Sequence, residues 1–229
     1  MWGRLFGLEM LRRLRLRRAP PGPLHAYYST PFPKSGHRLG QVRFVAIDLE
    51  TTGHNPAHDE ILSIGLIGLS CDCIDLGSAN HYYLAPEHDI PEASAIIHQI
   101  TDDHAAQGGA LSQILPRVLS QLAGRVMIAH HAGMERAFLD LACRRQYGVG
   151  LTLPVVDTET LCRRQFDRRG QVYQAADLRL HALRERFALP QYRAHDALSD
   201  ALAAAELFLV FQAQAGIGAD ERLRSVLTG

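Results

Sequence analysis

The chain has 229 residues, of which 47% are apolar and 21% charged, and its 24 basic and 24 acidic side chains give a formal net charge of zero. This composition is typical of one folded soluble domain and excludes a wholly disordered chain or a fibrous repeat. A zero net charge would also argue against a nucleic-acid-binding protein, because such proteins usually carry excess positive charge. That argument weakens once the charges are mapped, since residues 1–40 sum to +7 and residues 41–229 to −7.

Residues 1–40 are predicted to form a basic N-terminal extension and linker. Residues 1–18 interleave Leu with Arg and lack the continuous apolar run of a secretory signal. They could form a basic helix that touches nucleic acid, a membrane or a partner, a solvated extension without a specific role, or a mitochondrial transit peptide. The Pro- and Gly-rich stretch at 19–23 ends any helix, and a second one at 31–36 marks the linker.

The cysteine content and the hydropathy pattern indicate the cellular compartment that we expect for this chain. The four cysteines, at positions 71, 73, 143 and 162, are too few and too irregularly spaced for a disulfide framework, so we expect a cytoplasmic protein. No second Cys or His pair at zinc spacing accompanies Cys71 and Cys73, which predicts ordinary thiols. The longest apolar stretch, 201–211, is shorter than the roughly 20 residues that span a bilayer, so no transmembrane segment is expected.

From residue 41 onward, the hydrophobic pattern predicts regular elements. Strands are expected at 42–48, 61–69 and 81–84, then helices at 91–100 and 110–122, a strand at 125–129, a helix at 134–145, a strand at 153–156, and helices at 178–187 and 197–214. Strands followed by alternating helices and strands predict an α/β domain with a mixed sheet. We assign this domain to residues 41–215 and a short C-terminal tail to residues 216–229.

Two carboxylates stand at the end of the first predicted strand, in the run FVAIDLETTG at 44–53. Residues two apart on a strand share a face, so Asp48 and Glu50 point the same way. Placing two like charges together in a buried site is costly without a cation, and hard oxygen ligands select Mg²⁺ or Mn²⁺. Taken alone, the pair could also be a solvated strand end before the turn at Thr52 and Gly53.

Further acidic residues stand near the starts of two predicted helices. Asp200 follows His195 by five residues and precedes an alanine-rich apolar run, where burial alone would favour an aliphatic side chain. Glu135 lies in the run IAHHAGMERAFL at 128–139, where a strand leads into a helix. By itself, an acidic residue in a first helical turn is also favoured by the helix dipole.

Together, Asp48, Glu50, Glu135, His195 and Asp200 resemble the DEDDh class of 3′–5′ exonucleases, and most of all the proofreading epsilon subunit of bacterial DNA polymerase III. The resemblance covers about residues 43–214 and rests on the Asp-Xaa-Glu-Thr-Thr-Gly and His-Xaa4-Asp motifs. The related tyrosine class has Tyr four residues before its last Asp, where this chain has Asp196, so the histidine class is indicated. The resemblance implies a ribonuclease H-like fold, with a mixed β-sheet flanked by helices.

The resemblance also implies the roles of these residues. Asp48, Glu50 and Asp200 would bind two divalent ions, Mg²⁺ or Mn²⁺, with Asp48 bridging them, and Glu135 would complete the catalytic set. His195 would be the general base, which suits a side chain with a reference pKa of about 6.5. Two metals roughly 4 Å apart can clamp the attacking and leaving oxygens of a phosphodiester. The expected products are nucleoside 5′-monophosphates released from single-stranded 3′ ends.

Substrate contacts are implied at two more residues. These are Thr51 in the first motif and His98, which stands in His-Gln-Ile-Thr where the resembling family has His-Gly-Ile-Thr.

At one catalytic position the chain departs from the family pattern. The family usually has Asp where this chain has Glu135, which keeps the charge and adds one methylene, so we expect retained activity with an altered metal preference. Asp140 is a poor substitute, because five residues along a helix rotate it by about 140° from Glu135. His130 and His131 are expected to be structural and not to be metal ligands.

The sequence leaves the substrate and the partners open. We expect DNA in preference to RNA, in proofreading or repair, and a polymerase or another protein is a possible partner. The tail at 216–229 is too short for the polymerase-docking segment that usually follows the nuclease domain in the resembling subunits. The alternatives are a ribonuclease that trims RNA or oligonucleotide 3′ ends, since the metals read the phosphate and not the sugar, and a weakly active nucleic-acid-binding subunit.

Overall fold

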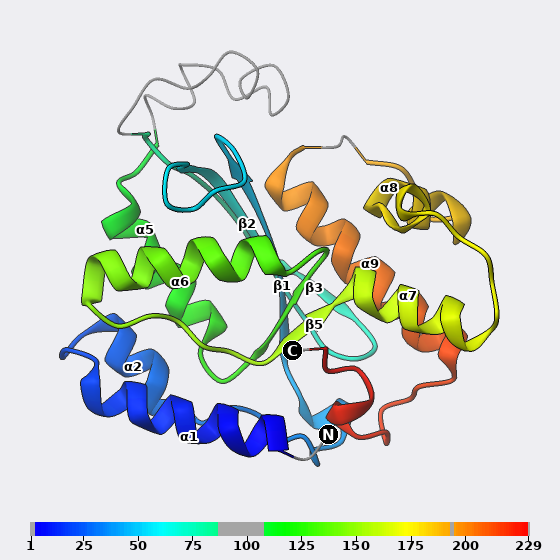
Figure 1. Cartoon of the computed structure of the whole chain (residues 1–229), viewed down its shortest axis with the longest axis horizontal. Coiled ribbons are helices and arrows are strands. Elements are labelled where there is room, and N and C mark those ends of the chain that lie inside the picture. The colour runs from blue at the N-terminus through cyan, green and yellow to red at the C-terminus, as the bar shows by residue number, and fades with distance from the viewer. Residues whose placement is uncertain (1–2, 87–107, 193–194, 229) are drawn as a thin grey trace.

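Five strands form one mixed sheet in the computed structural model, which describes residues 3–86, 108–192 and 195–228 (Figure 1). The strands are β1 (Phe44–Thr51), β2 (Ile61–Leu69), β3 (Ile74–Tyr83), β4 (Val126–Ala129) and β5 (Val155–Asp157), in the spatial order β3-β2-β1-β4-β5. β2 is antiparallel to both of its neighbours, whereas β4 and β5 continue the sheet parallel to β1. The predicted α/β class with a mixed sheet is therefore confirmed.

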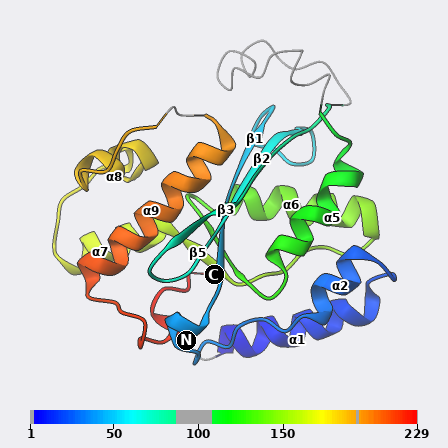
Figure 2. The ribbon, with the colours of Figure 1, turned by 180° about the vertical axis from the view of Figure 1, so that it is seen from behind.

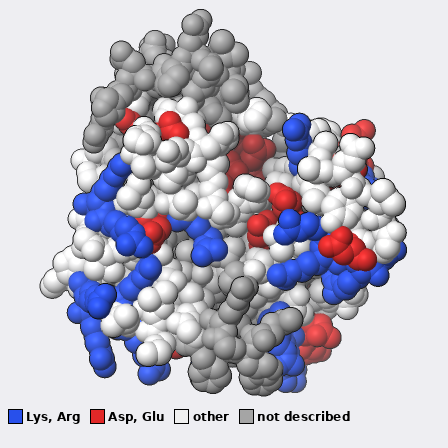
Figure 3. All heavy atoms as spheres, viewed as in Figure 1, with Lys and Arg blue, Asp and Glu red and all other residues white. Residues whose placement is uncertain are grey.

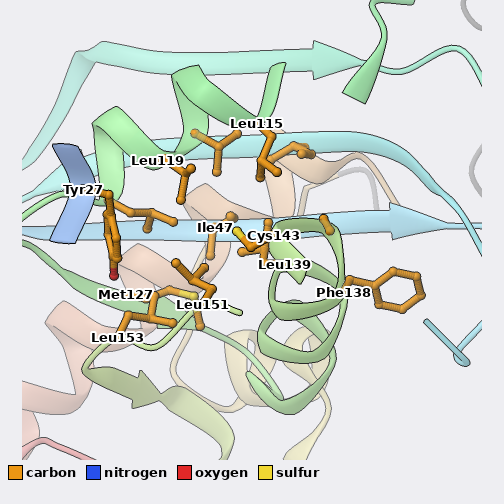
Figure 4. Packing of buried hydrophobic residues seen from close by; sticks show 14 of the residues in the cluster. Tyr27, Ile47, Leu115, Leu119, Met127, Phe138, Leu139, Cys143, Leu151 and Leu153 are labelled. Atoms are coloured by element: carbon orange, nitrogen blue, oxygen red, sulfur yellow. The ribbon is translucent and has the colours of Figure 1, made fainter. Parts of the chain in front are cut away.

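Helices cover both faces of this sheet, as Figures 1 and 2 show from opposite sides. They are α1 (Gly3–Arg18), α2 (Pro23–Ser29), α5 (Leu111–Leu122), α6 (Gly133–Tyr147), α7 (Thr158–Arg168), α8 (Leu180–Arg186) and α9 (Ala197–Ala215). Side chains alternate across β1, so Ile47 packs with α2, α5 and α6 (Figure 4), whereas Phe44 and Ala46 pack with α7 and α9. The strand that carries the acidic pair is thus buried on both faces.

Residues 19–32 contribute to the core, although the sequence suggested a linker there. α1 ends at Arg18, before Pro20, as predicted, but α2 then places Tyr27 and Tyr28 in the same hydrophobic cluster as β1. The Tyr27 hydroxyl donates to the Thr152 carbonyl oxygen at 2.9 Å, and the Tyr28 hydroxyl donates to that of Gly150 at 2.7 Å. Two buried aromatic rings with satisfied hydroxyls anchor α2 to the domain.

The C-terminal tail also packs on the domain, against the segment that leads into β1. The Leu39 amide donates to the Glu221 carbonyl oxygen at 2.8 Å, and the Leu223 amide donates to that of His37 at 2.9 Å. Leu223 and Val226 are buried in the cluster between the sheet and α9. Both flanks of the predicted domain therefore help to cover its core.

Most predicted elements are confirmed to within a few residues at each end, and the strand at 61–69 is reproduced without change. β3 begins seven residues before the predicted 81–84 strand. Its first half lies at the sheet edge and is exposed or half-exposed, so it lacks the apolar run of a buried strand. α2 and α7 were not predicted. The predicted helix at 91–100 lies outside the described residues. No helix in the described part of the chain is both long and apolar enough to cross a bilayer.

Candidate metal-dependent active site

The acidic pair of β1 lies on the sheet face that α9 covers. Asp48 and Glu50 continue the side of the strand that begins with Phe44 and Ala46, which are buried against α9. Asp48 is half-buried, and Glu50 is only 5% exposed. Alternation along the strand therefore places both carboxylates on the face that α9 covers, and the sequence predicted that they share a face.

A glycine in the neighbouring strand lets α9 approach this pair. Asp48 stands opposite Gly65 of β2. A Cβ at Gly65 would lie 2.2 Å from the carbonyl carbon of Ala197, the first residue of α9, so only glycine permits this contact. The helix start rests directly on the strand beside Asp48, which explains how Asp200, one turn into α9, reaches residues about 150 positions earlier in the chain.

His195 and Asp200 meet at the start of α9. The helix is capped by Asp196, whose carboxylate accepts from the Ser199 amide at 2.8 Å. The backbone amide of His195 donates to Oδ2 of Asp200 at 2.9 Å, and His195 has a positive φ of 65°. Ligand atoms of Glu50, His195 and Asp200 all lie within 4.8 Å of one another.

Glu135 enters the same site from the first turn of α6. Its side chain is 1% exposed, and its Oε2 has no hydrogen-bond partner among the described residues. Burial, reinforced by the charges of Asp157 and Glu50, raises the pKa of Glu135 to about 8. A buried carboxylate oxygen without a donor is costly when ionised, unless a cation balances it.

The other carboxylates show the same electrostatic pattern. Burial raises the pKa of Asp48 well above its ordinary value, and the charges of Glu135, Glu50, Asp200 and Asp196 raise it further. Burial also raises the pKa of Asp200, to about 6, although the amide of His195 opposes this shift. In Figure 3, acidic side chains gather in a hollow near the starts of α6 and α9, and basic side chains lie on either side of it.

This group of side chains fits divalent cations. Its donors are carboxylate oxygens with one nearby imidazole, a set that suits Mg²⁺ or Mn²⁺ better than a thiolate-preferring metal. A cation bound among these groups would offset the burial and repulsion that raise their pKa values, and would face the Oε2 of Glu135, which has no hydrogen-bond partner among the described residues.

Two acidic residues near the site were not assigned a role from the sequence. Asp196 and Asp157 both cap helices, and their charges raise the pKa of Asp48 and of Glu135, respectively. Each stands directly before a helix in the structure, the position where an N-capping Asp is common, and neither position by itself indicated a link to the other carboxylates. Asp157 accepts from the amides of Glu159 and Thr160 at 3.0 and 3.4 Å.

The remaining candidates differ in their surroundings. Thr51 is buried, and its hydroxyl donates to the Gly53 carbonyl oxygen at 2.6 Å, whereas His98 lies outside the described residues. His130 lies 2.9 Å from the Thr158 hydroxyl, and burial lowers the pKa of its imidazole. His131 lies 2.9 Å from a carboxylate oxygen of Glu159. Both His130 and His131 thus have partners on α7.

Known proteins are similar to this chain over the region that contains the candidate site residues. Residues 45–208 match the RNase T family model, described as "Exonuclease". The chain is 29% identical over 173 residues to a PolC-type DNA polymerase III of Thermotoga maritima, covering 76% of this chain and 12% of that protein. It is 30% identical over 170 residues to the DNA polymerase III subunit epsilon of Treponema pallidum, covering 73% of this chain and 75% of that protein. The chain therefore spans a small part of the PolC-type relatives and most of the epsilon subunit.

Solved structures share the fold at lower identity. A complex of Escherichia coli ExoI with single-stranded DNA superimposes with a TM-score of 0.66 at 17% identity, covering 77% of this chain and 41% of that chain. The nuclease domain of 3′hExo, titled a DEDDh family member bound to rAMP, gives 0.65 at 16% identity, covering 82% of this chain and 96% of that chain. The five-stranded mixed sheet flanked by helices is thus the ribonuclease H-like fold that the sequence predicted. Since the family model covers most of the chain, including Asp48, Glu50, Glu135, His195 and Asp200, the chain belongs to the RNase T exonuclease family.

Proposed function

We propose that this chain is a 3′–5′ exonuclease that hydrolyses phosphodiester bonds at single-stranded DNA 3′ ends and releases nucleoside 5′-monophosphates. Two divalent cations, Mg²⁺ or Mn²⁺, are its cofactors. The observation that carries the proposal is the convergence of Glu50, His195 and Asp200, whose ligand atoms lie within 4.8 Å of one another, with Asp48 and Glu135 close enough to share their electrostatic field. Membership of the exonuclease family supports it.

Each side chain of the site has a distinct role in this proposal. Asp48, Glu50 and Asp200 hold the cations, and Glu135 adds negative charge from the buried side. When bound there, the cations would supply the positive charge that activates the attacking water and stabilises the leaving oxygen. His195 accepts the proton of that water, for which an exposed imidazole near neutral pH is suited. Its exposed position at the rim leaves room for a substrate phosphate beside Glu50 and Asp200.

DNA is the proposed substrate because several similar proteins are named for DNA. The relatives include DNA polymerase III proteins, and one structural neighbour is an ExoI complex with single-stranded DNA. The same names support a polymerase as the proposed protein partner, in proofreading or repair. We propose Thr51 as a substrate contact because its backbone continues directly from Glu50, and we retain the same role for His98.

The experiment offers the purified chain 5′-labelled single-stranded DNA and RNA of one sequence, with Mg²⁺, Mn²⁺ or a chelator. We expect a ladder of shortened DNA products that chelator abolishes, and slower shortening of RNA. Asp48→Asn should lower the rate on the order of 1,000-fold, as when one member of a catalytic unit is removed. Faster shortening of RNA would overturn the DNA assignment.

The matched control is Asp220→Asn. Asp220 is an exposed carboxylate that forms an ion pair with Arg38. Arg38 precedes β1, whereas Asp48 lies within the second half of that strand. The control should keep the wild-type rate. Undiminished shortening by Asp48→Asn, or equal losses in the two variants, would contradict the assignment of the active site.

A further inference from the structure

Arg184 of α8 is buried beneath residues 187–192, the described part of the segment that follows α8. It is the largest of the fully buried side chains in the described part of the chain. Its guanidinium donates to the carbonyl oxygens of Pro190 and Ala203, with Nε 3.0 Å from the former and Nη1 3.2 Å from the latter. It also forms an ion pair with Glu206 of α9 at 2.7 Å. Arg184 therefore ties α8, the segment after it and α9 together.

Tyr192 is held by the same two charged residues. Its ring lies over the Arg184 guanidinium, with 4.5 Å from Cζ to the ring centroid. Its hydroxyl donates to Oε1 of Glu206 at 2.8 Å. Pro190 is fixed by its carbonyl oxygen and Tyr192 by its ring and hydroxyl, so the segment has three points of attachment to this ion pair.

His195 follows Tyr192 by only three residues. Three residues of extended chain reach about 10 Å, so a fixed Tyr192 restricts where His195 can lie. The backbone amide of His195 is attached at the other side to Asp200. One cavity of about 400 Å³ lies between α8 and α9, and its lining includes Arg184, Tyr192, His195 and Asp200. The buried arginine and two residues of the candidate active site therefore border the same cavity.

We propose that Arg184 and Glu206 are positioning residues that hold residues 190–192, and thereby keep the imidazole of His195 beside Glu50 and Asp200. The role of His195 in this inference rests on the proposed function. A buried ion pair is a weak source of stability, because desolvating both charges costs about as much as their attraction returns. The pair supplies geometric specificity instead, because a guanidinium that binds two carbonyl oxygens and an aromatic ring favours one position of residues 190–192.

The test separates positioning from stability with two variants. Arg184→Met keeps an unbranched chain and removes the guanidinium, but leaves the half-buried Glu206 without its cationic partner, so the melting temperature should fall. In the double variant Arg184→Met/Glu206→Leu both charges are absent, and replacing a buried pair by apolar side chains is often neutral for stability. We expect kcat for single-stranded DNA to fall about 10- to 100-fold in both variants, the scale of a small misplacement, with KM little changed.

Arg12 provides the matched control. It is the other buried arginine of the described residues, and it pairs with Glu9 at 2.8 Å and donates to the Tyr28 carbonyl oxygen. Arg12→Met should lower the melting temperature as Arg184→Met does, but leave kcat unchanged. If the double variant regains wild-type kcat along with its stability, Arg184 and Glu206 only stabilise the fold. A raised KM with wild-type kcat would instead make Arg184 a substrate contact.

A double-mutant cycle with His195→Ala asks whether the effect passes through His195. If it does, Arg184→Met lowers kcat in the wild-type chain and changes it little in the His195→Ala chain. Equal losses in both backgrounds would overturn the inference. The ring resonances of His195, assigned by comparison with His195→Ala, give a readout that needs no activity. They should shift in the double variant and stay in place in Arg12→Met, and unshifted resonances in the double variant would also overturn the inference.

Discussion

At the scale of single residues, Glu135 is the most deeply buried of the four candidate carboxylates. It is 1% exposed, and burial and neighbouring charges raise its pKa from 4.5 to about 8. In the absence of metal, the folded chain therefore keeps a proton on Glu135 that the unfolded chain releases near pH 4.5. Proton linkage then makes the free energy of unfolding depend on pH.

The sign of that dependence gives a prediction for the chain in chelator. Because the folded state binds the extra proton, the contribution of Glu135 to stability is full below about pH 4.5 and is lost as pH rises to about 8. Denaturant unfolding at several pH values should show the wild-type chain losing stability relative to Glu135→Gln over this window. A difference between the two chains that is constant with pH would show that Glu135 is ionised in the folded apoprotein.

The candidate residues differ in how far the sequence could reveal them. Asp48 and Glu50 are two apart on a strand, so one periodicity fixes their common face. Their distance from Asp200 depends instead on the absence of a side chain at Gly65, a contact between elements that no local pattern predicts. Asp157 was missed for a different reason, since α7, the helix that it caps, was itself not predicted.

At the scale of elements, the contact of β2 with α9 determines whether the site can assemble. Gly65→Ala would place a Cβ 2.2 Å from the Ala197 carbonyl carbon, so the helix start must move away from the strand. We expect a lower melting temperature and a loss of nuclease activity that exceeds the loss of folded protein. Circular dichroism and the 5′-labelled strand assay measure the two quantities.

Gly7→Ala is the control for this substitution. A Cβ at Gly7, in α1, would meet nothing within 4 Å, and Ala is favoured over Gly in a helix by up to about 1 kcal/mol. Its activity should be that of the wild-type chain. If Gly65→Ala keeps both wild-type stability and wild-type activity, α9 does not need this close contact to deliver Asp200.

The basic helix α1 requires a finer test than truncation. Removing residues 1–40 would expose the core where Tyr27 and Tyr28 pack, so any loss of binding would be confounded by unfolding. Arg13, Arg17 and Arg18 are exposed, whereas Arg12 is buried and Arg15 lies 3.5 Å from Asp140. The three exposed arginines are the ones that can be replaced without disturbing the packing of α2.

We predict that replacing Arg13, Arg17 and Arg18 together by Gln leaves the melting temperature unchanged and weakens binding to long single strands. If each of the three contacts a phosphate, the slope of log K against log salt should become shallower by about 2, at roughly 0.7 per contact. Binding to short oligonucleotides, which reach only the active site, should change little. Equal salt slopes for the variant and the wild-type chain would remove α1 from the nucleic-acid interface.

Local patterns predicted α9 but missed α2 and α7. α9 has 19 residues and its strongly apolar sequence stands out, whereas α2 has seven and offers only Leu24, Tyr27 and Tyr28 as a buried set. α7 is rich in arginine and has few apolar residues, so its burial of Leu161 and Phe166 is hard to see in the sequence. Packing against a sheet stabilises such helices, and that contribution has no local signature.

At the scale of the whole molecule, the zero net charge is the sum of unlike regions. Residues 1–40 contribute +7 and the rest −7. Within the latter region, Glu50, Glu135 and Asp200 lie close enough for their charges to raise the pKa of Asp48. Figure 3 shows acidic side chains gathered in a hollow, with basic side chains on either side of it. The concentration of negative charge at the candidate centre would repel a phosphodiester. Bound divalent cations would reverse this local field, so cation binding and substrate binding should be coupled.

The same charge distribution predicts how cations affect stability. A cation that binds only the folded chain stabilises it by RT ln(1 + [M]/Kd), about 2.7 kcal/mol when its concentration is 100 times Kd. For a domain of this size, that free energy raises the melting temperature by roughly 5–10 °C. Scanning calorimetry in chelator and in Mn²⁺ should show this increase for the wild-type chain.

Asp48→Asn should melt higher than wild type in chelator, because a repelling charge is gone, and its melting temperature should rise little when Mn²⁺ is added. A wild-type-sized Mn²⁺ shift in Asp48→Asn would place the cation elsewhere and separate the acidic hollow from metal binding.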